Sequence, residues 1–377
     1  MAYNPTFTPF ALEYYQSQFE HTVEYNLADS SVKCVTTREW LDQDEIELLL
    51  NTGLFYPEVN GTRQLRESIA ALYPQAGPDN ILVTVGASQA NSLVCNTLLQ
   101  PGDEVVVLSP GYRQVAGLAL NAGCTVKELP LRPELGWQPE LAELDAMITT
   151  RTKLVAIVNP NNPTGTMLSQ AARERIVAAC TQVGAWLHAD EVYCGTERRP
   201  DAEETPTFWG HYDKLICTNS LSKAYGLSGL RIGWAVATEE VIAALWRRHE
   251  YSVIAAAAPS MTLATIALQP EKRRRLLNRQ KKLARAGWQV FEAWLAAQDG
   301  RFSVQRSDAT SIAFVHYQLP ISSVELAEQI RKQASVLVAP GGYLGTEQHL
   351  RITLGYEPAK VQAALDRISN VVAGLQT

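Results

Sequence analysis

Short apolar runs rich in β-branched residues alternate with helical segments over most of the chain. The runs cover residues 80–86, 103–110, 125–131, 153–160, 185–193, 214–220 and 231–237. Between them, segments such as 88–99 and 169–183 carry apolar residues at the spacing of one helix face. Strands that are apolar on both faces and separated by helices are typical of a mostly parallel sheet covered by helices on both sides. The sequence therefore predicts an α/β fold built on such a sheet.

The C-terminal part of the chain predicts a second, smaller domain. At 377 residues, the chain exceeds the size at which a single hydrophobic core keeps growing, so two domains are expected. A long polar helical segment begins near residue 270, and short strands and further helices follow it. We expect an N-terminal segment over 1–44 that joins the small domain, a large domain over 45–269, and a small α+β domain over 270–377.

Composition and charge exclude several classes of protein. The formal net charge is −6, whereas a nucleic-acid-binding domain is usually basic. No apolar run reaches about 18 residues, the length that suggests a membrane span, and the N-terminus lacks a signal-peptide pattern. The six cysteines show no C-x-x-C pair, so neither a disulfide framework nor a metal site is predicted. We expect a cytoplasmic protein without nucleic-acid or membrane partners.

Polar residues follow several of the predicted strands, at the edge where parallel sheets bind ligands. Small residues open a helix at 86–91, where free N–H groups suit a phosphate. Tyr112 follows the second strand, and the turn NPNNPTG at 159–165 follows the fourth. Asp190 lies inside an apolar run, so its carboxylate requires a cationic partner. These features predict a ligand site at this edge.

Lys223 has an unusual sequence environment, because serines precede it closely and Arg231 follows eight residues later. A solvated loop lysine would be the ordinary interpretation. Pyridoxal 5′-phosphate (PLP), however, needs a lysine for its aldehyde and hydroxyls, amides and a cation for its phosphate. It also needs a carboxylate for its ring nitrogen and a flat side chain over its ring. The strand ends supply all of these groups, so the sequence predicts a PLP site.

The order of the motifs carries a family resemblance. GAS, PGY, NPNNPTG, DEVY and SLSK, followed by GLRIG, occur in this order. In combination they resemble the motifs of fold-type I PLP-dependent enzymes, specifically the class I and II aminotransferase family, over residues from about 25 to 370. The resemblance implies the aspartate-aminotransferase-like PLP-dependent transferase fold. In that fold the large domain binds PLP and the N-terminal segment covers the active site.

The resemblance also implies roles for individual residues. Lys223 is expected to form the Schiff base with PLP, and Asp190 to pair with the pyridine nitrogen. Tyr193 and Asn162 are expected to hydrogen-bond the 3-oxygen of the ring, and Tyr112 to stack on the ring face. The phosphate ligands are expected to be Gly86, Ala87, Ser88, Ser220, Ser222 and Arg231. On the residues alone, the two tyrosines would also suit core packing, and Asn162 and Ser222 could shape turns.

Two further residues concern the substrate and the assembly. Arg351, in the motif HLRITLG, matches the family arginine that binds the substrate α-carboxylate with a planar, two-pronged guanidinium, beside Asn162. Tyr56 matches the aromatic residue that reaches the phosphate of the neighbouring subunit. The resemblance therefore implies a homodimer with shared active sites and a small amino-acid substrate.

The N-terminal segment bears on the choice of substrate. Glu13, Glu20, Glu24 and Asp29 lie close together there, and no arginine occurs between residues 9 and 37. Carboxylates suit a basic substrate such as an arginine derivative, although they could equally form a solvated helix face. The segment also resembles the capreomycidine and enduracididine synthase branch of the family, which dehydrates and cyclises hydroxyarginines. We expect this reaction, with an ordinary class I aminotransferase reaction as the alternative.

Two other classes fit the sequence less well. A Rossmann-type dinucleotide site would need G-x-G-x-x-G, but the glycines of the GLSGLRIG segment fall at 226, 229 and 233. A regulator built on an aminotransferase fold would need an attached DNA-binding domain, for which little sequence precedes the motifs. It would also tend to lose the lysine, which this sequence retains as Lys223.

Overall fold

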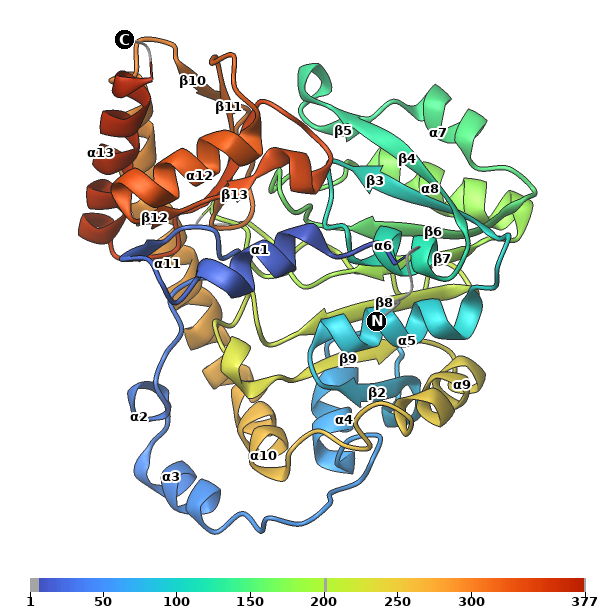
Figure 1. Ribbon diagram of the computed structural model, residues 1–377. Helices are drawn as coiled ribbons and strands as arrows, with labels where there is room; N and C mark the ends of the chain where they lie inside the picture. Colours follow the sequence, from blue (N-terminus) through green and yellow to red (C-terminus); the bar gives the residue numbers. More distant parts are fainter. Residues whose placement is uncertain (1–6, 200–201, 376–377) are drawn as a thin grey trace, which may run out of the picture.

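The computed structural model describes residues 7–199 and 202–375, and an eight-stranded mixed sheet forms its centre (Figure 1). In spatial order, the strands are Ile81–Thr84 (β2), Gly233–Val236 (β9), Leu215–Ser220 (β8), Trp186–Asp190 (β7), Thr152–Val158 (β6), Glu104–Ser109 (β3), Thr125–Arg132 (β4) and Gln138–Pro139 (β5). Neighbours from β8 to β4 are parallel. β9 is antiparallel to both of its neighbours, and β5 to β4. The predicted mostly parallel sheet is confirmed.

Each predicted apolar run overlaps a strand, and the limits of two of these strands bear on the site. The last begins at Gly233, because Arg231 takes a left-handed conformation, φ 51°, directly after the 3-10 turn Ser228–Leu230 (η3). The run at 185–193 leaves the sheet after Asp190. This carboxylate therefore stands at the end of its strand, at the edge where parallel sheets bind ligands.

Helices cover both faces of the sheet. One face carries Ala87–Leu98 (α5), Gln114–Asn121 (α6) and Glu239–His249 (α9), and the other carries Arg63–Ala70 (α4), Gln170–Val183 (α8) and Ala258–Ala267 (α10). Shorter elements are Pro78–Asn80 (η1), Pro133–Leu135 (η2) and Leu141–Met147 (α7). In β3, Val105 and Val107 pack beside α5 and α6, whereas Val106 and Leu108 belong to the core of the opposite face. The strand is apolar throughout because both faces are covered.

The alternation of side chains also decides where the polar residues of β7 point. Leu187 and Ala189 belong to the core that contains α8. His188 and Asp190 project to the other face, because successive side chains of a strand point to opposite sides. Asp190 there accepts a hydrogen bond from Asn91 of α5. A buried polar group is therefore placed under the first turns of α5.

A second sheet lies in the C-terminal part of the chain. It has the order β10-β11-β14-β13, with antiparallel neighbours, and consists of Phe302–Val304 (β10), Ile312–Tyr317 (β11), His349–Thr353 (β14) and Ala339–Pro340 (β13). Around it lie Pro270–Ala296 (α11), Ser323–Ala334 (α12), Gly341–Leu344 (η4) and Pro358–Gly374 (α13). Trp288, Phe291 and Trp294 of α11 share a hydrophobic core with these elements.

The N-terminal segment contacts both parts of the molecule. It contains Ala11–Phe19 (α1), Tyr25–Asn26 (β1), Thr37–Trp40 (α2) and Gln43–Leu50 (α3). β1 pairs in parallel with Val336–Leu337 (β12), beside the second sheet, and Figure 1 shows α1 crossing between the two sheets. In the described parts of the chain, no helix combines the length and the apolar character that crossing a membrane requires.

Candidate active site

A cavity of about 370 Å³ lies at the carboxyl ends of β6, β7 and β8. Its walls come from these strand ends, the first turns of α5, and the N-terminal segment. The volume falls within the range of about 300 to 1,000 Å³ that is usual for small-molecule sites. Most of the residues that the sequence singled out line it: Glu13, Glu20, Asp29, Ala87, Ser88, Tyr112, Asn162, Asp190, Tyr193, Ser220, Ser222, Lys223 and Arg231.

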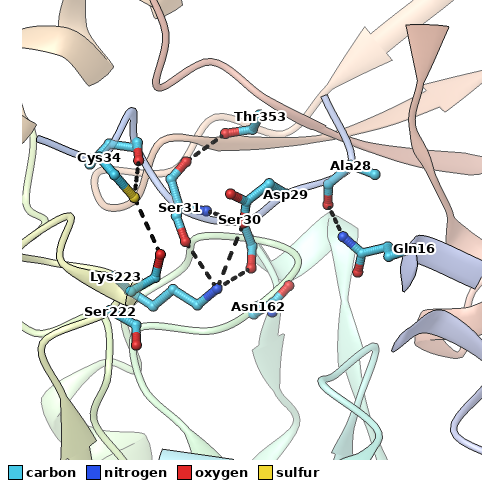
Figure 2. Close-up of polar contacts among 12 residues, drawn as sticks. Gln16, Ala28, Asp29, Ser30, Ser31, Cys34, Asn162, Ser222, Lys223 and Thr353 are labelled. Atoms are coloured by element: carbon cyan, nitrogen blue, oxygen red, sulfur yellow. Dashed lines mark hydrogen bonds and ion pairs between the residues drawn. The ribbon is translucent and has the colours of Figure 1, made fainter. Parts of the chain in front are cut away.

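Lys223 points from the loop after β8 toward the N-terminal segment (Figure 2). Its Nζ donates to the hydroxyls of Ser30 at 2.9 Å and Ser31 at 3.2 Å, and lies 4.0 Å from Asp29 Oδ1. The side chain is 26% exposed, so the amine is accessible from the cavity. These contacts hold the amine of Lys223 at the cavity wall through short polar side chains.

Asp190 is a buried carboxylate at the cavity wall, only 5% exposed. Burial raises its pKa, and the hydrogen bonds from Asn91 Nδ2 at 2.9 Å and the Val192 N–H at 3.2 Å oppose this shift, as does the charge of Lys223. Among the described residues, none forms an ion pair with Asp190. A buried carboxylate without a paired cation is costly. The site therefore favours a ligand that brings a positive charge to Asp190.

The start of α5 and Arg231 form the opposite end of the cavity. Gly86 has φ +77°, a conformation that favours glycine, and a Cβ atom on it would lie 2.3 Å from Arg231 Nη2, so the backbone and this guanidinium approach closely here. No side chain caps the first turn of α5. The N–H groups at Ala87 and Ser88 therefore face an anion site together with Arg231. Ser220 and Ser222 lie beside it, and the Ser222 N–H donates to Ser220 Oγ.

Arg351 is a buried cation, 1% exposed, on β14. Its Nη1 donates to Asn162 Oδ1 at 2.9 Å and its Nη2 to the Ala28 carbonyl at 2.5 Å. Within the described residues its Nε has no hydrogen-bond partner. Asn162 lines the cavity, so the guanidinium lies directly behind the cavity wall. A buried, planar guanidinium with an unpartnered N–H group suits an incoming carboxylate.

The two tyrosines line the cavity but are held differently. The Tyr112 hydroxyl donates to Glu13 Oε1 at 3.0 Å, and burial raises its pKa well above the ordinary value. The Tyr193 hydroxyl donates to the Ser30 carbonyl at 3.4 Å, and its side chain is 3% exposed. Both hydroxyls thus contact the N-terminal segment, which ties that segment to the site.

Three of the four predicted acids reach the cavity. Glu13, Glu20 and Asp29 line it. Glu24 does not: it is exposed, and its Oε2 accepts from Arg367 at 2.7 Å. Of the four acids expected to offer one or more contacts to the substrate, Glu24 is thus the one that the structure does not bring to the cavity. The reason is the pairing of β1, since the Glu24 N–H donates to the Ser335 carbonyl and places the residue beside the second sheet.

Tyr56 lies away from the cavity of its own chain. It is 81% exposed, in an exposed run with Leu54 at 91% and Phe55 at 66%. The sequence expectation concerns the cavity of a second subunit, so Tyr56 as a phosphate ligand stays a prediction.

Several cavity residues were not predicted from the sequence. Ser30 and Ser31 hold Lys223, Asn91 holds Asp190, and Gln114 and Ser228 also line the cavity. Asn91 could have been found, because it follows Ala87 by one helical turn and so shares its face of α5. No sequence signal marks the two serines, since their role depends on the path of the N-terminal segment across the molecule.

The residues present fit the cofactor expected from the sequence. The unpaired carboxylate of Asp190 fits the protonated ring nitrogen of PLP, and the uncapped start of α5 with Arg231 fits its phosphate. Lys223 provides the amine that an aldehyde requires. One molecule with a cationic ring and an anionic phosphate would thus provide both charge partners that the site lacks: a cation for Asp190, and an anion for Arg231 and the start of α5.

Comparisons with known proteins show the family and the fold of the chain. The model of the family described as aminotransferase class I and II matches residues 24–368. Capreomycidine synthase of Streptomyces vinaceus is 30% identical over 82% of this chain and 78% of its own length. Arginine–pyruvate transaminase of Pseudomonas aeruginosa is 34% identical over 52% of this chain and 51% of its own. A PLP-dependent aminotransferase from Streptococcus suis superposes with a TM-score of 0.90 at 28% identity, covering 98% of this chain and 99% of the other.

Proposed function

Because the chain belongs to the class I and II aminotransferase family and is therefore a PLP-dependent enzyme, we propose that its substrate is an α-amino acid with a cationic side chain. The family and the cofactor are common to its relatives and to its structural neighbours. The class of substrate is the part that we add, and it depends on the carboxylates of the cavity.

The residues of the site would have separate roles in such an enzyme. PLP, when bound, supplies an electron-accepting ring that stabilises negative charge at the substrate Cα. Asp190 holds a proton on the ring nitrogen and so keeps the ring electron-accepting. Lys223 removes the proton from Cα, and Arg351 with Asn162 fixes the α-carboxylate. These assignments leave the substrate side chain as the group that distinguishes one amino acid from another.

The placement of the acids carries the proposal for the side chain. Glu13, Glu20 and Asp29 line the cavity on the side of the N-terminal segment. Lys223 and Arg231 also line the cavity, but their proposed roles are toward PLP. In the described chain, Glu13 forms no ion pair, and its carboxylate is held by the Tyr112 hydroxyl alone. A dicarboxylic substrate would meet repulsion here. A guanidinium would form charge-assisted hydrogen bonds.

For the reaction, we favour loss of water and ring closure on a hydroxyarginine, without transfer of the amino group to a keto acid. The support is the similarity to capreomycidine synthase, which extends over 82% of the chain. Such a reaction is balanced without an oxidant: the proton that leaves Cα is later returned to it, the side-chain hydroxyl leaves, and a guanidine nitrogen bonds to the carbon that carried it. The N–H proton that this nitrogen loses accounts for the second hydrogen of the water released. The product is a cyclic guanidino amino acid.

Transamination of arginine with a 2-keto acid is the second candidate. It is favoured by the similarity to an enzyme named arginine–pyruvate transaminase. Both reactions share the removal of the Cα proton by Lys223, so the residues that line the cavity serve either one. The two differ in their need for a keto acid, which makes them separable by experiment.

A product assay tests both the substrate class and the reaction. The holoenzyme is incubated with arginine, γ-hydroxyarginine, glutamate and phenylalanine, each with and without pyruvate, and the products are identified by mass. We expect only the basic amino acids to react, and hydroxyarginine to lose the mass of water without pyruvate. Dependence on pyruvate would favour transamination, and a preference for glutamate or phenylalanine would contradict the basic substrate.

We also infer that the enzyme acts as a homodimer. None of the eight residues of α3 is buried, and the following run Leu54–Tyr56 exposes large apolar side chains. Figure 1 shows these segments extending along the edge of the molecule beside α10. Large exposed apolar surfaces usually mark an interface. A partner that covers this surface would bring its Tyr56 toward a neighbouring cavity, as the family resemblance implies.

A further inference from the structure

A continuous chain of hydrogen bonds connects Asp190 to a buried histidine that does not line the active-site cavity. Asn91 Nδ2 donates to Asp190 Oδ2 at 2.9 Å, and Thr218 Oγ1 donates to Asn91 Oδ1 at 2.8 Å. His188 Nε2 lies 3.0 Å from Thr218 Oγ1. His188 and Thr218 are 1% and 0% exposed. Buried polar groups of this kind are costly unless their partners are fixed.

The positions of the protons in this chain follow from one backbone carbonyl. The Ser88 carbonyl can only accept, so Gln114 directs Nε2 to it, at 2.8 Å, and Oε1 to Asn91. Asn91 must then direct Nδ2 to Gln114 Oε1, at 3.1 Å, and Oδ1 to Thr218. The single hydroxyl proton of Thr218 goes to Asn91, so Thr218 accepts from His188. His188 is therefore the tautomer that carries its proton on Nε2.

Strand pairing explains why these residues meet. Asp190 and Thr218 are register partners on the neighbouring strands β7 and β8, and His188 precedes Asp190 by two residues on the same face. This face lies under α5, which supplies Asn91. The amide of Asn91 is thus held between two strands that are themselves fixed in the sheet.

We propose that Asn91, Thr218 and His188 are positioning residues for Asp190: they keep the amide N–H of Asn91, instead of its carbonyl oxygen, directed at the carboxylate that binds the ring nitrogen of PLP. If the amide rotated, its oxygen would face the carboxylate and favour the protonated form of Asp190. That form cannot stabilise a positive ring nitrogen. The inference concerns the cofactor and is independent of the substrate class, so either proposal can fail alone.

The surroundings of His188 agree with a neutral donor. Burial lowers its pKa to about 4, so the ring is uncharged near neutral pH. Among the described residues, Nδ1 has no hydrogen-bond partner. A small cavity of about 20 Å³ borders His188, Asp190 and Asn161, with otherwise mostly apolar walls. This is space for about one water molecule, which can donate to Nδ1 of the neutral ring.

Two pairs of variants test the chain of hydrogen bonds. Thr218→Val removes the hydroxyl and Thr218→Ser keeps it; His188→Leu removes the donor and His188→Gln keeps an N–H near the position of Nε2. We measure the dissociation constant of PLP from the apoprotein, the pH dependence of the visible absorption of bound PLP, and the thermal unfolding of each apoprotein. Losing a hydrogen bond that acts on a charged group corresponds to about a 10-fold to 100-fold change in an equilibrium constant.

We expect Thr218→Val and His188→Leu to weaken PLP binding by about 10-fold and to shift the spectral pH transition, with Thr218→Ser and His188→Gln close to the parent protein. Equal PLP affinity and equal spectra in Thr218→Val and Thr218→Ser would overturn the proposal. The proposal would also be overturned if both variants of a pair lost PLP affinity in proportion to the decrease in their unfolding temperatures. Such a result would indicate that the substitutions act through packing alone.

Nitrogen NMR of the apoprotein gives a second, activity-independent measurement. The His188 signal, identified by its loss in His188→Gln, should show a neutral ring protonated at Nε2 near neutral pH. A proton on Nδ1, or a doubly protonated ring, would contradict the assigned direction of the hydrogen bonds and with it the role of Thr218.

Discussion

Glu13→Gln is the sharpest test of how the cavity selects its substrate. Glu13 Oε1 accepts from the Tyr112 hydroxyl at 3.0 Å, and the amide oxygen of glutamine can accept the same bond. The substitution therefore removes the charge without releasing Tyr112. If Glu13 binds the guanidinium of the substrate, its neutralisation should raise KM for arginine-class substrates more than it lowers kcat, because the interaction lies remote from the reacting carbon.

The size of the effect follows from the exposure of the group. A hydrogen bond to a charged partner contributes about 1.5 to 3 kcal/mol. Glu13 is exposed to solvent before the substrate binds, so the lower end of this range applies. A loss of about 1.5 to 2 kcal/mol corresponds to roughly a 10-fold to 30-fold decrease in kcat/KM. The same substitution should leave kcat/KM for citrulline, a neutral analogue of similar shape, nearly unchanged.

The assay compares kcat/KM for the arginine-class substrate and for citrulline across matched variants. Glu24→Gln is the control, because Glu24 lies in the same segment but pairs with Arg367 outside the cavity. Glu20→Gln and Asp29→Asn complete the series. If every variant shows the same ratio of kcat/KM between the arginine-class substrate and citrulline as Glu24→Gln does, the acids do not select the substrate. A parallel loss for citrulline would also refute the reasoning, since it would show a general disturbance of the site.

Four further predictions follow from the same structure. Lys223→Ala should abolish turnover with the fold intact, measured by product formation and circular dichroism; a borohydride-reducible lysine adduct in this variant would contradict it. Asp190→Asn should fold normally and lose activity by several orders of magnitude, and an unimpaired variant would show that Asp190 does not serve the ring nitrogen. Burial raises the pKa of Glu191 from 4.5 to about 7, so the folded protein holds a proton there that the unfolded chain has released, and stability should fall as pH rises through this window; Glu191→Gln should flatten the dependence of Tm on pH, and an unchanged slope would exclude this group as its source. Tyr56→Ala should weaken PLP binding in a protein that sediments as a dimer, whereas a fully active monomer would refute the shared site.

Local sequence was sufficient for the fold class and for most of the cavity. The apolar runs became strands because each is covered on both faces, which is visible in the sequence as apolar character without alternation. Glycine at 86 and the serines around Lys223 were recognisable because the chemistry of a phosphate and an aldehyde demands small, polar neighbours. Asp190 was recognisable because a carboxylate inside an apolar run requires a partner.

The N-terminal segment shows where such reasoning fails. The four acids look equivalent in the sequence, but β1 pairs with β12 and turns Glu24 toward Arg367, while Glu13 and Asp29 face the cavity. Ser30 and Ser31 carry no signal at all, and their contact with Lys223 joins residues about 190 positions apart in the sequence. Contacts of this range depend on the path of the chain across the sheet.

The sequence by itself determined the α/β fold, and it predicted the reactive lysine and the groups that would hold the cofactor, because each follows from local periodicity or from the chemistry of neighbouring side chains. Only the tertiary structure decided which acids face the cavity, that Arg351 lies behind Asn162, and that hydrogen bonds connect His188 and Thr218 to Asn91 and so to Asp190. The physical reason is register: a shift of one residue between β7 and β8 would turn Thr218 to the opposite face of the sheet, and no local pattern specifies that alignment.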